Sequence, residues 1–198
     1  MTDRTEQMRQ IRDEVIALEE SPLYRFRKEN DYYPVIGQGS HTARLMFIGE
    51  APGENEAKTG RPFCGASGRV LDELLASIDL KREDVYITNV LKDRPPGNRD
   101  PQKDEIALYA PFLDRQIKII QPQVIATLGR FAMEFILNRF DAAKNQKISS
   151  LHGQKIKAKA PYGEVYVVPL FHPAVALYRG DQKHILMEDF KVLKNIIS

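Results

Sequence analysis

Four apolar segments of the sequence are each followed by a loop whose side chains could do chemistry. A carboxylate can place a water molecule or offset positive charge, a planar amide can pair with a base edge, and an imidazole can exchange a proton near neutral pH. An aromatic ring adds a stacking surface. In sequence order the loops supply Glu50 with Phe63, Asn89 with Lys92 and Arg94, Gly129 with Arg130, and His172. Together they predict a small polar pocket with one stacking surface.

Each of these residues has an ordinary structural explanation when it is considered alone. A loop glutamate such as Glu50 is usually solvated, and Asn89 could simply form a turn. Phe63 could belong to the core, and His172, which precedes a proline, could lie in a surface turn. The carboxyl ends of parallel strands, however, meet at one edge of a sheet, where ligands bind. Convergence of the four loops at that edge favours the functional interpretation.

The apolar segments that position these loops have the composition of buried strands. Strands are expected near residues 44–49, 84–89, 124–128 and 165–170. Apolar residues spaced three and four apart predict helices over 4–19, from about 67 to 78, over 106–120 with Pro111 inside, from 130 to about 138, and over 186–197. Segments 28–43 and 141–162 are expected to be irregular connections. This alternation predicts an α/β fold, a three-layer α/β/α sandwich around a central four-stranded, mostly parallel sheet.

The composition narrows the classes of partner. Of the 198 residues, 42% are apolar and 28% are charged, and the net charge is +2. Such a small net charge predicts no general affinity for polyanions, so a nucleic-acid contact has to come from local clusters of Lys and Arg. No apolar run has the length of a membrane span, and the N-terminus, MTDRTEQMRQ, is too polar for a signal peptide. We expect one domain over residues 1–198, a monomer, and a cytoplasmic location.

The glycine-rich loop 49–60 also has to be considered as a phosphate-binding loop. A Walker A loop ends in Gly-Lys-Ser/Thr at the start of a helix, whereas this loop contains Lys58-Thr59-Gly60. The Gly-x-Gly-x-x-Gly pattern is also absent after this strand. Nucleotide hydrolysis is therefore disfavoured.

Three segments resemble the motifs of family 4 uracil-DNA glycosylases, in the correct order and at sensible spacing. The segment GEAPGENEAKTGRPFCGASGRVL at 49–71 resembles the first motif of that family. The middle motif is matched by VYITNVLKDRPPGNRDP at 85–101 and the histidine motif by FHPAVAL at 171–177, with IIQPQVIATLG at 119–129 between them. The resemblance runs from about residue 6 to the end. It implies an enzyme that flips uracil out of DNA and hydrolyses its N-glycosidic bond, which leaves an abasic site in base-excision repair.

The resemblance also implies which residues hold the base. Phe63 would stack on the uracil ring, and the Asn89 amide would pair with O4 and N3–H, an edge that cytosine does not offer. Backbone amides around Gly49 and Ala51 would hold O2. Glu56 aligns with a residue that crowds C5 and excludes the thymine methyl group.

Two further residues would act on the glycosidic bond. A neutral His172 would donate to O2 and stabilise the leaving uracil anion, by the logic of an oxyanion hole. Glu50 would orient the attacking water and offset the positive charge on the sugar. Because no suitably placed lysine nucleophile is present, a monofunctional enzyme is expected.

Basic and apolar side chains outside the pocket are the candidates for DNA contact. Arg94 and Arg99, in the proline-rich loop, and Arg130 are candidates for phosphate contact. One of Leu177, Tyr178 and Arg179 would fill the space left by the flipped base.

The sequence departs from family 4 at the iron–sulfur site. Typical members hold a [4Fe–4S] cluster with four cysteines, whereas this chain contains one cysteine, Cys64. The matching positions are Ser21, Tyr24, Asp93 and Tyr109. We therefore expect no metal and no cofactor. Two alternatives stay open, a non-catalytic protein that binds damaged or single-stranded DNA, and a small-molecule enzyme such as a nucleoside hydrolase.

Overall fold

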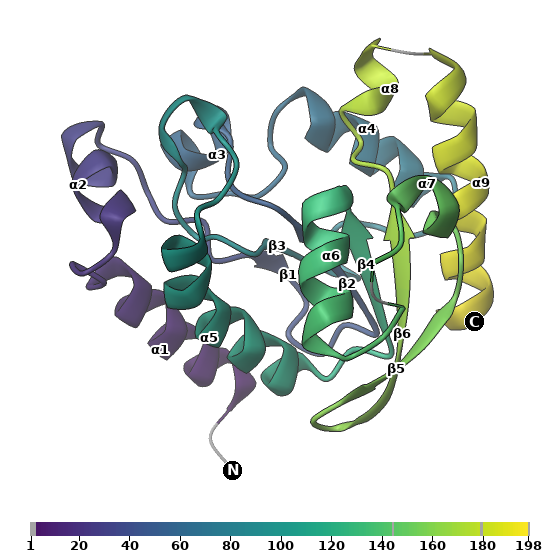
Figure 1. The fold of residues 1–198 in the computed structure, drawn as a ribbon, viewed down its shortest axis with the longest axis horizontal. Coiled ribbons are helices and arrows are strands. Elements are labelled where there is room, and N and C mark those ends of the chain that lie inside the picture. The colour runs from purple at the N-terminus through teal and green to yellow at the C-terminus, as the bar shows by residue number, and fades with distance from the viewer. Residues whose placement is uncertain (1–2, 144, 179, 198) are drawn as a thin grey trace.

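The computed structural model describes residues 3–143, 145–178 and 180–197 of the chain (Figure 1). In these residues one six-stranded sheet has the strand order β1-β3-β2-β4-β6-β5. Its four central strands are parallel, as predicted. They are β3 (Tyr86–Asn89), β2 (Leu45–Gly49), β4 (Val124–Leu128) and β6 (Gly163–Leu170).

The predicted number of four strands is wrong, because two antiparallel strands extend the sheet at its edges. β1 (Gln38–Gly39) pairs with β3, and β5 (Ile156–Ala160) pairs with β6. β1 is two residues long and carries no apolar pattern. β5 has buried alanines alternating with exposed lysines, and such a half-solvated edge strand lacks the continuous apolar run of a central strand.

Helices cover both faces of the sheet, so the three-layer α/β/α architecture is confirmed (Figure 1). On one face lie α1, α5 and α6, and on the other lie α4 and α9. The helices are α1 (Arg4–Ile16), α2 (Pro22–Glu29), α3 (Glu54–Thr59), α4 (Ala66–Ala76), α5 (Lys103–Ile120), α6 (Arg130–Arg139), α7 (Ile148–Leu151), α8 (Val175–Tyr178) and α9 (Gly180–Ile197). α5 runs through Pro111.

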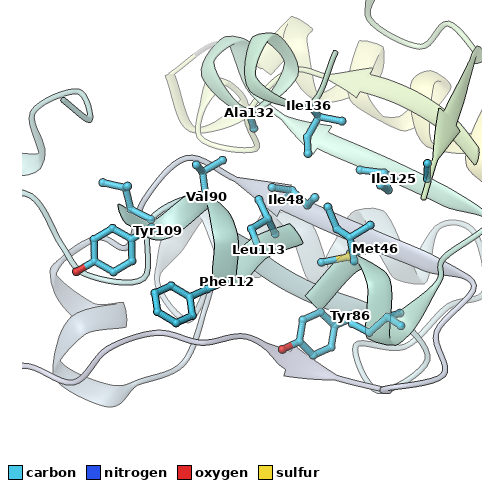
Figure 2. Close-up of a cluster of buried hydrophobic side chains, with 14 of the residues drawn as sticks. Met46, Ile48, Tyr86, Val90, Tyr109, Phe112, Leu113, Ile125, Ala132 and Ile136 are labelled. Carbon is cyan, nitrogen blue, oxygen red and sulfur yellow. The ribbon is translucent and has the colours of Figure 1, made fainter. Parts of the chain in front are cut away.

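Strand β2 shows why the sheet must be covered on both sides. All five of its residues are buried. Because successive side chains of a strand point to opposite faces, Met46 and Ile48 enter the core beneath α1, α5 and α6, shown in Figure 2, while Leu45 and Phe47 enter the core beneath α4 and α9. This packing fixes where the strands end and the loops begin. In Figure 1 α3 and α8 lie at the top of the view, and the β5–β6 hairpin lies at the opposite end.

The short helices α2 and α3 are not predicted by apolar periodicity, because eight and six residues are too few for a clear repeat. Capping explains where α2 begins. The Ser21 hydroxyl accepts a hydrogen bond from the backbone N–H of Leu23, and Pro22 occupies the first turn, where its missing N–H is not needed.

A buried polar network joins α2 to the loop after β3 and to α5. The Arg27 guanidinium donates to both carboxylate oxygens of Asp93, at 3.1 and 2.9 Å, and to the carbonyl of Val15 at 3.0 Å. The Tyr109 hydroxyl donates to Asp93 at 2.5 Å and lies 2.8 Å from the Ser21 hydroxyl. Arg27 and Asp93 are only 4% and 1% exposed, so each charge relies on the other.

Removal of one partner should therefore reveal how much this network contributes to the stability of the fold. We predict that Asp93→Ala lowers the free energy of unfolding by about 3–5 kcal/mol, because Arg27 is left as an uncompensated buried charge. Urea denaturation at neutral pH measures the change. The matched control is Asp13→Ala, which breaks an exposed pair with Arg12 and should have little effect. Equal effects of the two substitutions would contradict the assigned role of the network.

Candidate active site

A cavity of about 180 Å³ lies where β2, β3 and β6 end. It is lined by Ala51, Gly53, Glu56, Phe63, Ser67, Asn89 and His172. Residues at or after the ends of three of the four predicted strands thus meet at one sheet edge, whereas Gly129 and Arg130, after β4, do not line this cavity. Glu50 and Gly49, which were expected beside these residues, do not line the cavity itself.

Asn89, the last residue of β3, brings an unpaired acceptor to this cavity. The residue is 2% exposed, and its side-chain oxygen Oδ1 has no hydrogen-bond partner among the described residues. A buried acceptor without a donor costs free energy, and such groups are uncommon in native structures. Gly49 makes room for it, because a Cβ at that position would lie 2.3 Å from Oδ1. The arrangement leaves Oδ1 available to a donor on a ligand.

Lys92 supports Asn89 through the backbone carbonyl of that residue. Its fully buried Nζ donates to the Asn89 backbone carbonyl at 2.7 Å, to Thr88 Oγ1 at 2.8 Å and to Gln116 Oε1 at 2.6 Å. Burial holds the pKa of Lys92 well below its usual range. This lysine follows a strand end, but its amine is committed to these acceptors and does not line the cavity.

Phe63 forms the aromatic wall. It comes from the loop between α3 and α4 and is 6% exposed. Its ring centroid lies 5.6 Å from that of His172, with 30° between the ring planes. Gly49 also makes room for this ring, because a Cβ there would lie 2.9 Å from Phe63 Cζ.

His172 follows β6 and presents a defined tautomer. Its Nδ1 accepts a hydrogen bond from the backbone N–H of Ala174 at 3.2 Å, so in the neutral ring the proton is on Nε2. Burial lowers the pKa of His172, and the negative charge of Glu56 opposes this effect. Near neutral pH the ring is therefore an uncharged donor through Nε2.

Glu56 has a structural role as well as a place in the wall. One of its carboxylate oxygens accepts hydrogen bonds from the backbone N–H groups of Cys64 and Gly65, at 3.1 and 3.3 Å. These bonds fix the turn between Phe63 and α4. The lone cysteine thus contributes a backbone amide here, and its Sγ lies 3.3 Å from the Thr59 hydroxyl.

Glu50 lies outside the cavity lining and is partly buried. Burial raises the pKa of Glu50, the charge of Asp100 raises it further, and Arg130 lowers it. Its carboxylate is therefore set between a negative and a positive neighbour at the carboxyl edge of the sheet.

The three predicted arginines differ in how far they are already engaged. Arg94 is 10% exposed and contacts Asn98, Tyr32 and Glu54. Arg99 is bound to the buried carboxylate of Glu105. Arg130 is 60% exposed and lies 3.4 Å from Glu134.

Two of the three candidates for insertion into the DNA stack are strongly exposed. Leu177 and Tyr178, in α8, are 44% and 86% exposed. Arg179 lies outside the described residues. Large exposed apolar side chains next to the His172 loop are compatible with insertion into a base stack.

Ser67 was not predicted as part of this site, and Lys92 was predicted beside Asn89 but not in its supporting role. Ser67 lines the cavity from the first turn of α4, the helix that follows the Phe63 loop. Four larger pockets, of 390 to 840 Å³, are lined by none of the predicted site residues except Arg130. Among the described residues, no cluster of three His, Cys, Asp or Glu side chains could hold a metal ion.

Comparison with known proteins identifies the family of this chain. Residues 36–193 match the model of the uracil DNA glycosylase superfamily. The type-4 uracil-DNA glycosylases of Sulfurisphaera tokodaii and Saccharolobus solfataricus are each 43% identical over 190 residues, covering 96% and 95% of this chain and 84% and 85% of those proteins. That of Thermotoga maritima is 39% identical over 199 residues, covering 100% of this chain and 98% of the relative. This chain therefore belongs to the uracil DNA glycosylase superfamily.

Proposed function

We propose that this protein is a monofunctional uracil-DNA glycosylase that acts in base-excision repair. The observation that carries the proposal is the buried, unpaired Oδ1 of Asn89 in a cavity that also contains Phe63 and His172. The type-4 relatives, which align with nearly the whole chain, bear the same activity in their names. Uracil-containing DNA is the substrate, and the protein would work as a monomeric, single-domain enzyme of the cytoplasm. None of the described helices combines the length and apolar character needed to cross a membrane.

The pocket would select uracil through its hydrogen-bonding edge. Oδ1 of Asn89 accepts from uracil N3–H, and the Asn89 amide nitrogen donates to O4. Cytosine presents an acceptor at N3 and a donor at C4, so both of these bonds would be lost. The flipped ring stacks on Phe63, and the side chain of Glu56 occupies the wall that would meet a thymine methyl group. Backbone amides around Gly49 and Ala51 hold O2.

Bond cleavage would use His172 and Glu50. The bond between sugar C1′ and uracil N1 breaks, and its electron pair leaves with the base. The Nε2–H of His172, whose other ring nitrogen is held by Ala174, donates to O2 and stabilises this anion. Glu50 holds the water whose oxygen bonds to C1′ as one of its protons passes to the solvent, and its charge offsets the positive sugar. Because Lys92 is committed to three acceptors, it supplies no nucleophile to C1′, which supports a hydrolytic, monofunctional reaction.

DNA would be held at the same edge. Arg130 offers an exposed guanidinium to a phosphate, and Arg94 and Arg99 would stiffen the proline-rich loop and contribute positive charge. One of Leu177, Tyr178 and the neighbouring Arg179 would fill the gap in the base stack.

The residues at the four positions matched to cluster cysteines do not fit an iron–sulfur cluster. The Tyr109 hydroxyl hydrogen-bonds to both Ser21 and Asp93, and the guanidinium that binds Asp93 lies 5.0 Å from the centroid of the Tyr24 ring. These side chains offer hydroxyl and carboxylate groups where a cluster takes thiolates. We propose that the network stabilises this region without a metal.

A uracil-release assay tests the proposed activity. We predict that Asn89→Ala lowers kcat/KM by about 100-fold or more, because a site built to pair with a base edge loses both bonds. Free uracil is measured after incubation with single- and double-stranded oligonucleotides that contain it. The control, Asn195→Ala, removes an exposed amide from α9 and should leave release unchanged.

Three results, from this assay and from matching measurements of DNA binding and deoxyuridine cleavage, would contradict the proposal. No release by folded wild type would exclude the enzyme. DNA binding that ignores uracil and survives Asn89→Ala would favour the non-catalytic alternative. Cleavage of free deoxyuridine without activity on DNA would favour the nucleoside hydrolase.

The dependence of uracil release on pH tests the role of Glu50. Glu50 acts as an anion, and its raised pKa means that activity should fall as the pH is lowered through that pKa. Asp100→Asn removes a negative neighbour, which lowers the pKa of Glu50, so the acidic limb of the profile should move to lower pH. Single-turnover rates at saturating DNA measure this shift. Asp104→Asn is the control, and an acidic limb that stays in place in both variants would exclude Glu50 as the titrating group.

Metal analysis tests the cluster-free network. Purified protein should be colourless and free of iron and acid-labile sulfide, because four thiolates cannot come from one cysteine. Anaerobic incubation with iron and sulfide should leave its melting temperature and iron content unchanged. Stoichiometric iron, or stabilisation on incubation, would contradict the proposal.

A further inference from the structure

Phe63, the aromatic wall of the cavity, has a backbone conformation that its side chain does not favour. Its φ is +48°, in the left-handed region. Residues with a Cβ rarely adopt this region, and a phenylalanine has no polar side chain to compensate locally. Such a conformation persists only where the surrounding structure holds it. The direction of the ring therefore depends on contacts made by the backbone of residues 62–65.

Arg82, in the loop between α4 and β3, makes the contacts that hold this backbone from one side. Its two terminal nitrogens donate to the carbonyls of Pro62 and Phe63, at 2.9 and 2.6 Å. Its Nε donates to the Asp72 carboxylate at 2.8 Å, which fixes the guanidinium against α4. The planar fork of an arginine matches two adjacent carbonyls in a way that a single ammonium cannot. One side chain thus fixes the peptide groups on both sides of the Phe63 Cα.

The opposite side of the same carbonyl is closed by α4. A Cβ at position 68 would lie 1.8 Å from the Phe63 carbonyl oxygen, so only a glycine there allows the helix to approach. The carbonyl is therefore enclosed between Gly68 and the Arg82 guanidinium. Glu56 holds the next two amides, as described above.

We propose that Arg82 is a positioning residue that sets the Phe63 ring at the height and angle needed to stack on the flipped base. The inference rests on the proposed function, since it assigns Phe63 the stacking role. Arg82 does not line the cavity, so it acts through the Phe63 backbone. Without the fork, the peptide can relax from the left-handed region, and the ring leaves the cavity wall.

A phosphate contact is the competing role for an arginine in such an enzyme. All three nitrogen groups of Arg82 are already engaged, and its side chain is 20% exposed. A residue that neutralises a phosphate contributes to the salt dependence of DNA binding, whereas a residue that supports Phe63 does not. The two roles therefore predict different salt slopes.

A double-mutant cycle on the proposed reaction measures the coupling of the two residues. Arg82→Ala should lower kcat/KM for uracil release about 10- to 100-fold, on the scale of base–aromatic stacking. Arg82→Lys should restore little of this loss. The variant that combines Phe63→Ala with Arg82→Ala should be no worse than Phe63→Ala alone, because Arg82 acts only through that ring. Arg9→Ala, which removes an exposed arginine from α1, should change nothing. Additive losses, or a smaller salt slope in Arg82→Ala, would overturn the proposal.

A spectroscopic measurement tests the Arg82 clamp, the two hydrogen bonds to the carbonyls of Pro62 and Phe63, without using activity. The chain contains no tryptophan, so Phe63→Trp introduces a single indole at the cavity wall. Addition of Arg82→Ala should shift its emission to longer wavelength and make acrylamide quenching stronger, whereas addition of Arg9→Ala should not. Unchanged emission and quenching would overturn the clamp even if wild type releases uracil. Absence of uracil release with the expected spectral change would instead overturn the proposed function and leave the clamp supported.

Discussion

The candidate site depends on the register that places Gly49, at the end of β2, beside Asn89, at the end of β3. Because residue 49 lacks a Cβ, the Asn89 side-chain oxygen and the Phe63 ring can both approach the β2 backbone. A slip of one residue would turn the side chains of β3 to the other face of the sheet and remove the amide from the cavity. The apolar side chains of β2, buried on both faces, oppose such a slip. The hydrophobic core therefore determines where a base edge can be read.

The parts of the fold that can be predicted from the sequence are those whose buried residues form a long apolar pattern. The central strands are continuous apolar runs, and α5 and α9 are long enough to repeat an apolar stripe several times. The missed elements are short or half-solvated. β1 consists of Gln38 and Gly39 and forms only because β3 offers it an open edge. The start of α2 depends on the cap at Ser21 and on the buried pairing of Arg27, and apolar periodicity reports neither.

The site follows the same division. Asn89, His172 and Phe63 could be predicted because each follows a strand or belongs to a recognisable motif, and the fold brings them to one cavity. The supporting contacts could not be predicted, because they join residues far apart in sequence through long side chains. Lys92 reaches Gln116, 24 residues away, and Arg82 reaches Phe63, 19 residues away. Such contacts depend on the relative placement of helices and loops, which packing decides.

Two adjacent buried residues connect the stability of the helical layer to the site. Asp93 turns toward Arg27 and Tyr109, while Lys92 turns toward Thr88, Gln116 and the Asn89 carbonyl. The carboxylate has a cation as partner, whereas the hydrogen bonds of the amine go to neutral oxygens. Burial lowers the pKa of Lys92, whereas the buried ion pair is formed by Asp93 and Arg27. Lys92 and Asp93 are joined by one peptide bond. The network that holds α2 and α5 therefore also limits the movement of the end of β3 and of the Asn89 amide.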